Sequence, residues 1–198
     1  GFEASRVLLV IDGVRMNNAI YRSGHLQNLI TTDQNMLSRV EVMYGPSSTV
    51  YGSDALGGTI QLITKVPYLS GNKKLLVTGT AFTRYSSVNS EKSIHADMSL
   101  GGKKIAWLQS YSFSSFGDMK MGDQDRKGYP GFGRRKKYID QVNGVDTILN
   151  NTDDRVQKFS GYKQWDIIQK LLYKPNDKIS HLLNFQISNT NDVPRYDR

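Results

Sequence analysis

The chain has no cysteine among its 198 residues. This absence excludes a disulfide framework, a cysteine nucleophile and any cysteine-based metal site. The chain also lacks a run of about 18 apolar residues, so no transmembrane helix is predicted. The strands of a membrane β-barrel carry only alternating apolarity, so this second absence leaves that class of protein open.

Motifs of catalysis are missing as well. Neither G-x-S-x-G nor H-E-x-x-H occurs, and the three histidines stand apart at positions 25, 95 and 181. Turn chemistry and strand pairing explain Asp12 and Glu41 better than an acid–base pair does. The Gly-rich residues 51–58 lack the Gly-Lys-Ser/Thr of a phosphate-binding loop. The sequence therefore predicts no catalytic residue and no enzyme.

Positive charge is in excess, with 26 Lys and Arg against 18 Asp and Glu, a formal net charge of +8. Such a balance can indicate nucleic-acid binding. The basic residues are scattered, however, and the one dense cluster, residues 134–137, follows a Gly-rich turn. A solvated loop is the simpler interpretation of that cluster. We therefore expect no nucleic-acid partner.

The most distinctive stretch is residues 39–65, where two β-patterned pieces flank a segment rich in Gly and Ser. Val40 and Val42 alternate with polar neighbours, which predicts a half-buried strand. Residues 59–64 predict a second strand. The glycines between them permit backbone geometries and close approaches that side chains would block.

This stretch resembles the closing part of the plug domain of TonB-dependent outer-membrane receptors. The matching positions are Arg39, Glu41, Gly45, Pro46, Tyr51, Gly52, Asp54, Gly57 and Gly58. Tyr44 departs from the pattern, since that family often has Arg before Gly-Pro. The resemblance therefore does not imply the usual electrostatic contact between plug and barrel at position 44.

The N-terminal stretch extends the resemblance. The apolar residues 7–11, ended by Asp12-Gly13, predict a buried strand, and residues 14–23 read as a loop. Thr32 or Asp33 is placed to cap a short turn leading to Met36. The resemblance implies that residues 1–67 form the C-terminal half of a plug domain, a small β-sheet with short helices. The first plug half and the TonB box have no counterpart here, which predicts a fragment.

From residue 68 the pattern changes to period two, typical of barrel strands. We predict that residues 68–198 hold about five antiparallel transmembrane strands, part of the 22-stranded barrel of the family. Short turns at Gly101-Gly102 and residues 175–177 contrast with a long external loop near residues 117–158. A soluble β-sandwich is the alternative, but unequal turn lengths and aromatic residues near strand ends favour the barrel.

The resemblance also suggests a ligand site. His25 lies in a segment similar to the plug loop of outer-membrane haem receptors, which implies a haem-iron ligand, with Arg22 beside a propionate and Tyr21 on the porphyrin. A loop histidine that hydrogen-bonds locally is the simpler alternative. Without haem, Arg15, Asn17, Tyr21 and Arg22 would suit a ferric siderophore. Structural roles are expected for His95 and His181.

Taken together, the resemblance implies a receptor in the Gram-negative outer membrane that takes up an iron-bearing ligand. Haem is favoured, a ferric siderophore or other metal chelate is the alternative, and a soluble β-rich binding module is a further one. No intrinsic cofactor is expected. The implied partners are outer-membrane lipid, the remainder of the receptor, and TonB with ExbB and ExbD, which would act through the missing box.

Overall fold

The computed structural model describes residues 7–16, 32–45, 55, 57–124 and 127–191. It divides into two compact units, which are described separately. The first unit comprises Gly1–Gly79, Asp97–Ser110 and Asp166–Ser188, and the second comprises Thr80–Ala96, Tyr111–Trp165 and Asn189–Arg198.

None of the helices within the described ranges has the length and apolarity needed to cross a membrane.

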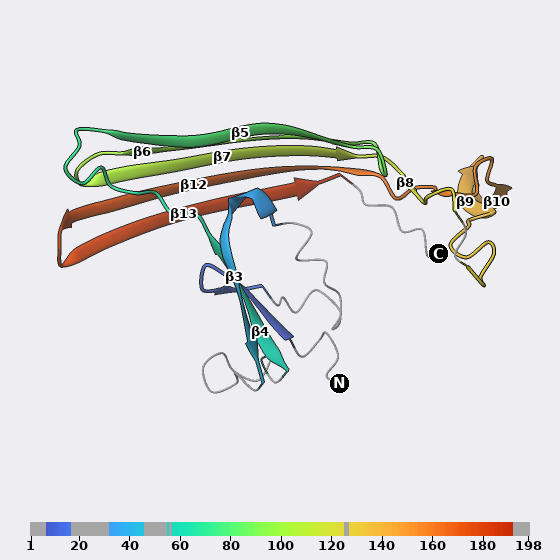
Figure 1. Ribbon diagram of the computed structural model, residues 1–198, viewed down its shortest axis with the longest axis horizontal. Coiled ribbons are helices and arrows are strands. Elements are labelled where there is room, and N and C mark those ends of the chain that lie inside the picture. The colour runs from blue at the N-terminus through green and yellow to red at the C-terminus, as the bar shows by residue number, and fades with distance from the viewer. Residues whose placement is uncertain (1–6, 17–31, 46–54, 56, 125–126, 192–198) are drawn as a thin grey trace. The chain divides into compact units, whose positions relative to one another are not determined.

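A small sheet, here called the N-terminal sheet, lies in the first unit (Figure 1). Its strands are β1 (Val7–Ile11), β2 (Val14–Arg15), β3 (Leu37–Tyr44) and β4 (Gly58–Thr64), in the order β2-β1-β4-β3. Strand β1 runs parallel to β4 and antiparallel to β2, and β3 is antiparallel to β4. The apolar run of β1 is buried, with Leu8 and Val10 fully covered beside Ala55, as predicted.

Two expectations for this sheet need correction. Residues 14–23 are not wholly a loop, because β2 pairs back onto β1 through Val10 with Arg15 and Ile11 with Val14. Val40 and Val42 are each about half exposed. The valines therefore do not mark a covered face, and the Arg39 and Glu41 side chains opposite them are also exposed, at 60% and 43%. Alternation alone cannot reveal what covers a strand.

Five long strands form the second sheet, here called the long sheet (Figure 1). They are β5 (Leu76–Ser86), β6 (Glu91–Gly101), β7 (Ile105–Phe116), β12 (Tyr162–Asn176) and β13 (Ile179–Thr190), in the order β13-β12-β7-β6-β5. Residues 87–90, 102–104 and 177–178 connect neighbours, and such short connections require antiparallel pairs. The sequence predicted about five barrel strands, and this sheet has five.

The two faces of the long sheet have inverted polarity relative to a soluble sandwich. On β6, β7 and β12 the covered positions include His95, Ser110, Ser112, Gln164 and Lys170. The opposite, exposed positions hold the large apolar side chains Ile94, Ile105, Trp107, Tyr111, Phe113, Trp165 and Leu171. An apolar outer face with a polar inner one is the pattern of a membrane barrel wall.

One polar side chain of the outer face has its partner on the same face. Gln169 lies on it, and its side-chain oxygen accepts a hydrogen bond from the Trp107 indole at 2.8 Å. This contact removes most of the cost of placing an amide oxygen in an apolar medium. The amide on the apolar face is therefore compatible with contact to lipid.

The segment predicted as a long external loop, residues 117–158, contains short paired strands. These are β8 (Met119–Lys120), β9 (Lys137–Val142), β10 (Val145–Asn150) and β11 (Val156–Gln157), which pair as β9-β10 and β8-β11. Asn143 and Gly144 join β9 to β10 with φ angles of +52° and +78°. Asn-Gly is the preferred pair for such a turn, so the sequence carried a hairpin signal that the interpretation as a loop overlooked.

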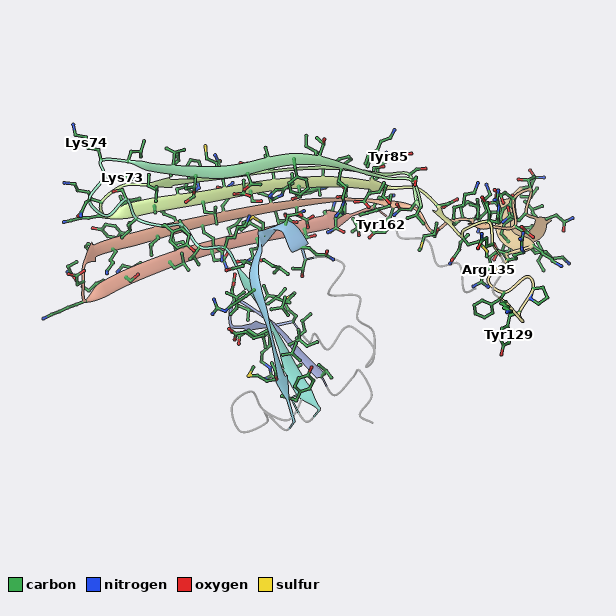
Figure 2. All side chains as sticks on the ribbon, viewed as in Figure 1. Lys73, Lys74, Tyr85, Tyr129, Arg135 and Tyr162 are labelled. Atoms are coloured by element: carbon green, nitrogen blue, oxygen red, sulfur yellow. The ribbon has the colours of Figure 1, made fainter. Side chains whose placement is uncertain are left out.

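Aromatic residues gather where strands of the second unit meet this segment. Figure 2 labels Tyr85 at the end of β5 and Tyr162 at the start of β12. The Tyr162 ring lies 4.6 Å, between centroids, from that of Phe116 at the end of β7. Aromatic girdles of this kind mark the membrane–water boundary in barrels.

Because of this face pattern, the 198-residue chain expressed alone is expected to be insoluble without detergent. Its long sheet has open edges and an outward apolar face that water does not solvate. Size-exclusion chromatography after expression without detergent checks this. A folded soluble monomer would contradict the assignment of the outer face.

Candidate functional site

The candidate site begins at the turn between β1 and β2. Asp12 and Gly13 form this turn with φ angles of +47° and +85°. Asp-Gly suits a tight hairpin with two positive φ values. The Asp12 amide donates to the carbonyl of Leu62 at 3.0 Å, which ties the turn to β4. The turn thus fixes where the Asp12 carboxylate projects.

That carboxylate gathers donors from both sheets. Oδ1 accepts from the Thr64 amide at 2.9 Å, and Oδ2 accepts from the Thr64 hydroxyl at 2.6 Å. On the long sheet, Oδ2 also accepts from Lys170 Nζ on β12 at 2.8 Å. The Asn184 and Gln186 amides on β13 each donate to it at 3.0 Å. We call Asp12, Thr64, Lys170, Asn184 and Gln186 the Asp12 cluster.

Burial makes the Asp12 cluster sensitive to charge. The Lys170 side chain is 1% exposed and that of Asp12 is 16% exposed. Burial raises the pKa of Asp12, but the hydrogen bonds from Lys170 and Thr64 outweigh it and hold the pKa below its ordinary value. Asp12 is therefore a carboxylate at neutral pH, and it supplies the counterion for a lysine that has almost no access to water.

A second ion pair joins the two sheets with reversed charges. Lys65, just after β4, places Nζ 3.1 Å from Asp97 Oδ2 on β6. Here the N-terminal segment supplies the cation and the long sheet supplies the anion. Two pairs of opposite polarity favour one register, because sliding one sheet over the other would bring like charges closer.

An apolar contact lies with these ion pairs in the first unit. Met36 ends a short 3₁₀ helix, Gln34–Met36. Asp33 caps this helix, as predicted, and the Asp33 side chain accepts a hydrogen bond from the Asn35 amide at 2.9 Å. Met36 is fully buried against Leu108 on β7 and Ile168 on β12. The Met36 carbonyl accepts from the Lys65 amide at 2.8 Å, which links this contact to the second ion pair.

A cavity of about 420 Å³ lies in the same unit. The N-terminal side contributes Ile11, Val14, Met16, Thr32 and Asp33. The long sheet contributes Asp166, Ile168, Asn184, Gln186, Ile187 and Ser188. Asn184 and Gln186 therefore belong both to the cavity wall and to the Asp12 cluster, so the cavity ends where the cluster begins.

Most of the predicted ligand residues cannot be placed. Asn17, Tyr21, Arg22 and His25 lie outside the described residues. Arg15 is exposed on β2. Within the described ranges, no group of three or more His, Cys, Asp or Glu side chains could hold a metal ion. The ligand site predicted from the sequence therefore stays a prediction.

The plug-motif residues that can be placed have structural contacts. Arg39 donates to Glu41 at 2.6 Å on the exposed side of β3. Gly45 has a φ of +85°. Gly58 has a φ of +142°, and a Cβ there would lie 2.7 Å from the Met43 carbonyl oxygen, so only glycine fits. Gly57 directly precedes β4, while Pro46, Tyr51, Gly52 and Asp54 lie outside the described residues.

The basic cluster of the long segment is partly paired. Arg134 contacts Asp154 at 2.9 Å, and Asp153 contacts Lys120 at 3.1 Å. The hydrogen bond from Lys120, helped by that from the Arg155 amide, lowers the pKa of Asp153. Arg135, Lys136 and Lys137 are exposed. Figure 2 labels Arg135 and Tyr129 in this part of the second unit.

The two described histidines lie on the long sheet. His95 is buried on β6, with Nδ1 2.7 Å from the Ser112 hydroxyl and its ring 5.2 Å from that of Phe82. His181 is exposed on β13 and stacks on Tyr173 at 6.3 Å. Both contacts are local packing.

Sequence reasoning missed the Asp12 cluster. Asp12 was explained as a turn residue, and Lys170 was not singled out within the period-two pattern. The usable signal was a lysine at a position whose strand neighbours on the same face, Gln164 and Asp166, are inward and polar. A charge on the inner face of a wall requires a counter-charge from whatever that wall encloses.

Comparison with known proteins gives a family match for the N-terminal region. Residues 1–59 match the family model of the TonB-dependent receptor plug domain.

Similar solved structures cover nearly the whole chain. The copper transporter OprC superposes with a TM-score of 0.60 at 16% identity, over 94% of this chain and 23% of its own. The siderophore receptor PirA from Acinetobacter baumannii gives 0.57 at 15% identity, over 94% and 24%. The FrpB iron transporter (F3-3 variant) from Neisseria meningitidis gives 0.54 at 19%, over 92% and 24%. These likenesses concern the fold, and the chain spans about a quarter of each structure.

We expect Asp12→Asn to destabilise the complete protein by about 3 kcal/mol, because it leaves Lys170 buried without a counterion. Lys170→Met should cost less, since Asp12 keeps its amide and hydroxyl donors. Thermal unfolding in detergent measures the loss of stability in each variant and so ranks the two. Glu41→Gln, on the exposed side of β3, is the control. A larger loss for Lys170→Met than for Asp12→Asn would contradict it.

The contribution of Asp12 should depend on pH. Its pKa in the folded protein is below the ordinary value of 3.8, so its stabilisation is complete above about pH 4. That stabilisation is lost as the pH falls through the lowered folded pKa. The stability difference between the unmodified protein and Asp12→Asn should therefore stay constant from pH 7 to about pH 5 and shrink below pH 4. A stability difference that grew as the pH fell would contradict the lowered pKa of Asp12.

Proposed function

We propose that this chain, whose residues 1–59 match the TonB-dependent receptor plug-domain family, is part of an outer-membrane receptor that takes up a metal-bearing small molecule. The N-terminal sheet is the plug part, and the long sheet is part of the barrel wall. The receptor resides in the Gram-negative outer membrane and performs transport rather than catalysis.

One observation carries this proposal. The N-terminal sheet is held by the Asp12 cluster against a sheet whose inner face is polar and whose outer face is apolar. A wall of this kind encloses a hydrated lumen and presents its other face to lipid. Polar contacts suit a plug that has to move, because water can replace each hydrogen bond as it breaks.

Movement of such a plug needs energy from outside the outer membrane. In this proposal TonB, with ExbB and ExbD, supplies that energy. The remainder of the receptor closes the barrel. The ion pairs Asp12–Lys170 and Lys65–Asp97 are then the contacts that a pull on the plug has to work against.

Two classes of ligand fit the proposal. The names of the similar structures mention copper, a siderophore and iron, which supports a metal-bearing ligand. Haem would use His25 as iron ligand, with Arg22 and Tyr21 beside it. A ferric siderophore would use the charges and side chains of Arg15, Asn17, Tyr21 and Arg22 instead.

The test is a titration of the complete receptor in detergent with haemin, followed through the Soret band. In the haem case, His25→Ala should weaken binding at least about tenfold and shift the band, because the axial ligand is lost. His181→Ala, which removes an exposed histidine stacked on Tyr173, is the matched control.

A parallel titration uses ferric hydroxamate and catecholate siderophores, followed by quenching of tryptophan fluorescence. Siderophore binding without haemin binding would assign the second ligand class and give His25 a local structural role. Saturable haemin binding that His25→Ala leaves unchanged would remove His25 as the ligand. Failure of both titrations would contradict uptake of an iron-bearing molecule.

A further inference from the structure

The two ends of the contact between the sheets are held in different ways. At the Lys65 end, the chain continues directly into the link to β5, residues 65–75. The Ser70 amide in this link donates to the Gly102 carbonyl at 2.9 Å, and a Cβ on Gly101 would lie 2.1 Å from the Tyr68 carbonyl oxygen. Covalent connection, backbone bonds and close packing therefore all act at this end.

At the Asp12 end, side chains hold the turn to the long sheet. Lys170, Asn184 and Gln186 reach the Asp12 carboxylate, and all three converge on Oδ2. Loss of this one oxygen as acceptor removes the hydrogen bonds of all three side chains to the turn. Lys170 Nζ then keeps its contact with the Thr64 hydroxyl on β4. Contacts that share one acceptor fail together, whereas those at the Lys65 end are independent of one another.

The cavity adjoins the end that can fail as a unit. Asn184 and Gln186 line it while donating to Asp12, and Ile11 and Val14 border the Asp12-Gly13 turn from the other side. Displacement of this turn therefore enlarges a space that already exists.

We propose that the passage between plug and wall opens at this cavity, along β12 and β13. The Asp12 cluster is its catch, and the Lys65–Asp97 pair with the link to β5 is its hinge. This proposal rests on the proposed function and specifies where that transport occurs. When Asp12 moves away, water enters and hydrates Lys170. Without that water, Lys170 would keep a buried charge that has no counterion.

The experiment measures access to the cavity without needing the transported ligand. In the complete receptor in detergent, on a background without other cysteines, Ser188→Cys places one thiol in the cavity wall. Its reaction rate with a membrane-impermeant methanethiosulfonate reagent reports how often the cavity opens. The rate is compared in three forms: Ser188→Cys alone, with Asp12→Asn, and with Lys65→Met as the matched control at the hinge.

If the Asp12 cluster holds the cavity closed, Asp12→Asn raises the labelling rate at least about tenfold, while Lys65→Met changes that rate less than about twofold. An unchanged rate with Asp12→Asn, or an equal rise with Lys65→Met, would overturn the proposal. Circular dichroism and heat-modified gel mobility verify that each variant keeps a folded barrel. If Asp12→Asn fails to fold, Asn184→Leu with Gln186→Leu removes two of the three donors and gives the same comparison.

A second arm ties the site to transport. In one double variant, Val14→Cys with Ser188→Cys, a short bifunctional thiol reagent links the two cysteines and closes the cavity. In the other, Tyr68→Cys with Lys103→Cys, the same reagent links the plug side to the wall at the hinge. Uptake of radiolabelled ferric siderophore or haemin should stop only with the first crosslink and return after cleavage of the reagent. Uptake that continues through the closed cavity overturns the passage, whereas no uptake of either probe before crosslinking contradicts the proposed function.

Discussion

The Asp12 carboxylate is the group on which the first unit depends. It accepts from the Thr64 amide and hydroxyl within its own sheet, and from Lys170, Asn184 and Gln186 on the other. The same group therefore fixes the β1–β2 turn against β4 and neutralises a lysine that is 1% exposed. A buried ion pair contributes little net stability over an apolar pair of the same shape, but it is costly to break from one side. The Asp12–Lys170 pair therefore selects one arrangement of the two sheets rather than adding to the free energy of unfolding.

The inverted polarity of the long sheet explains why the contact is built from charges and amides. A wall whose outer face meets lipid has to turn its polar side chains inward, and anything it encloses has to offer them partners. Met36 against Leu108 and Ile168 is the exception, an apolar contact beside two ion pairs. Apolar burial holds the sheets together without direction, while the ion pairs of opposite polarity set the register. A contact of this composition can release and reform in a hydrated lumen.

Much of the fold could be predicted because its signals are local. The buried run of β1, the Asp33 cap and the alternation along β6, β7, β12 and β13 each depend on neighbours in sequence. Two failures have physical reasons. Val40 and Val42 alternate correctly, but their exposure depends on what lies beside β3. The β9–β10 hairpin was overlooked although Asn143-Gly144 indicated it, because charge and glycine content suggested a loop.

By itself, the sequence determined the strand periodicities, the turn chemistry at Asp12-Gly13, and a motif dense enough to indicate the family. These properties follow from backbone geometry and from side chains a few positions apart. Only the tertiary structure decided what Asp12 does, since Lys170 is 158 residues and Gln186 is 174 residues away along the chain. Convergence of donors from three strands on one oxygen depends on sheet order and register, and both are set by packing over the whole unit rather than by any local pattern.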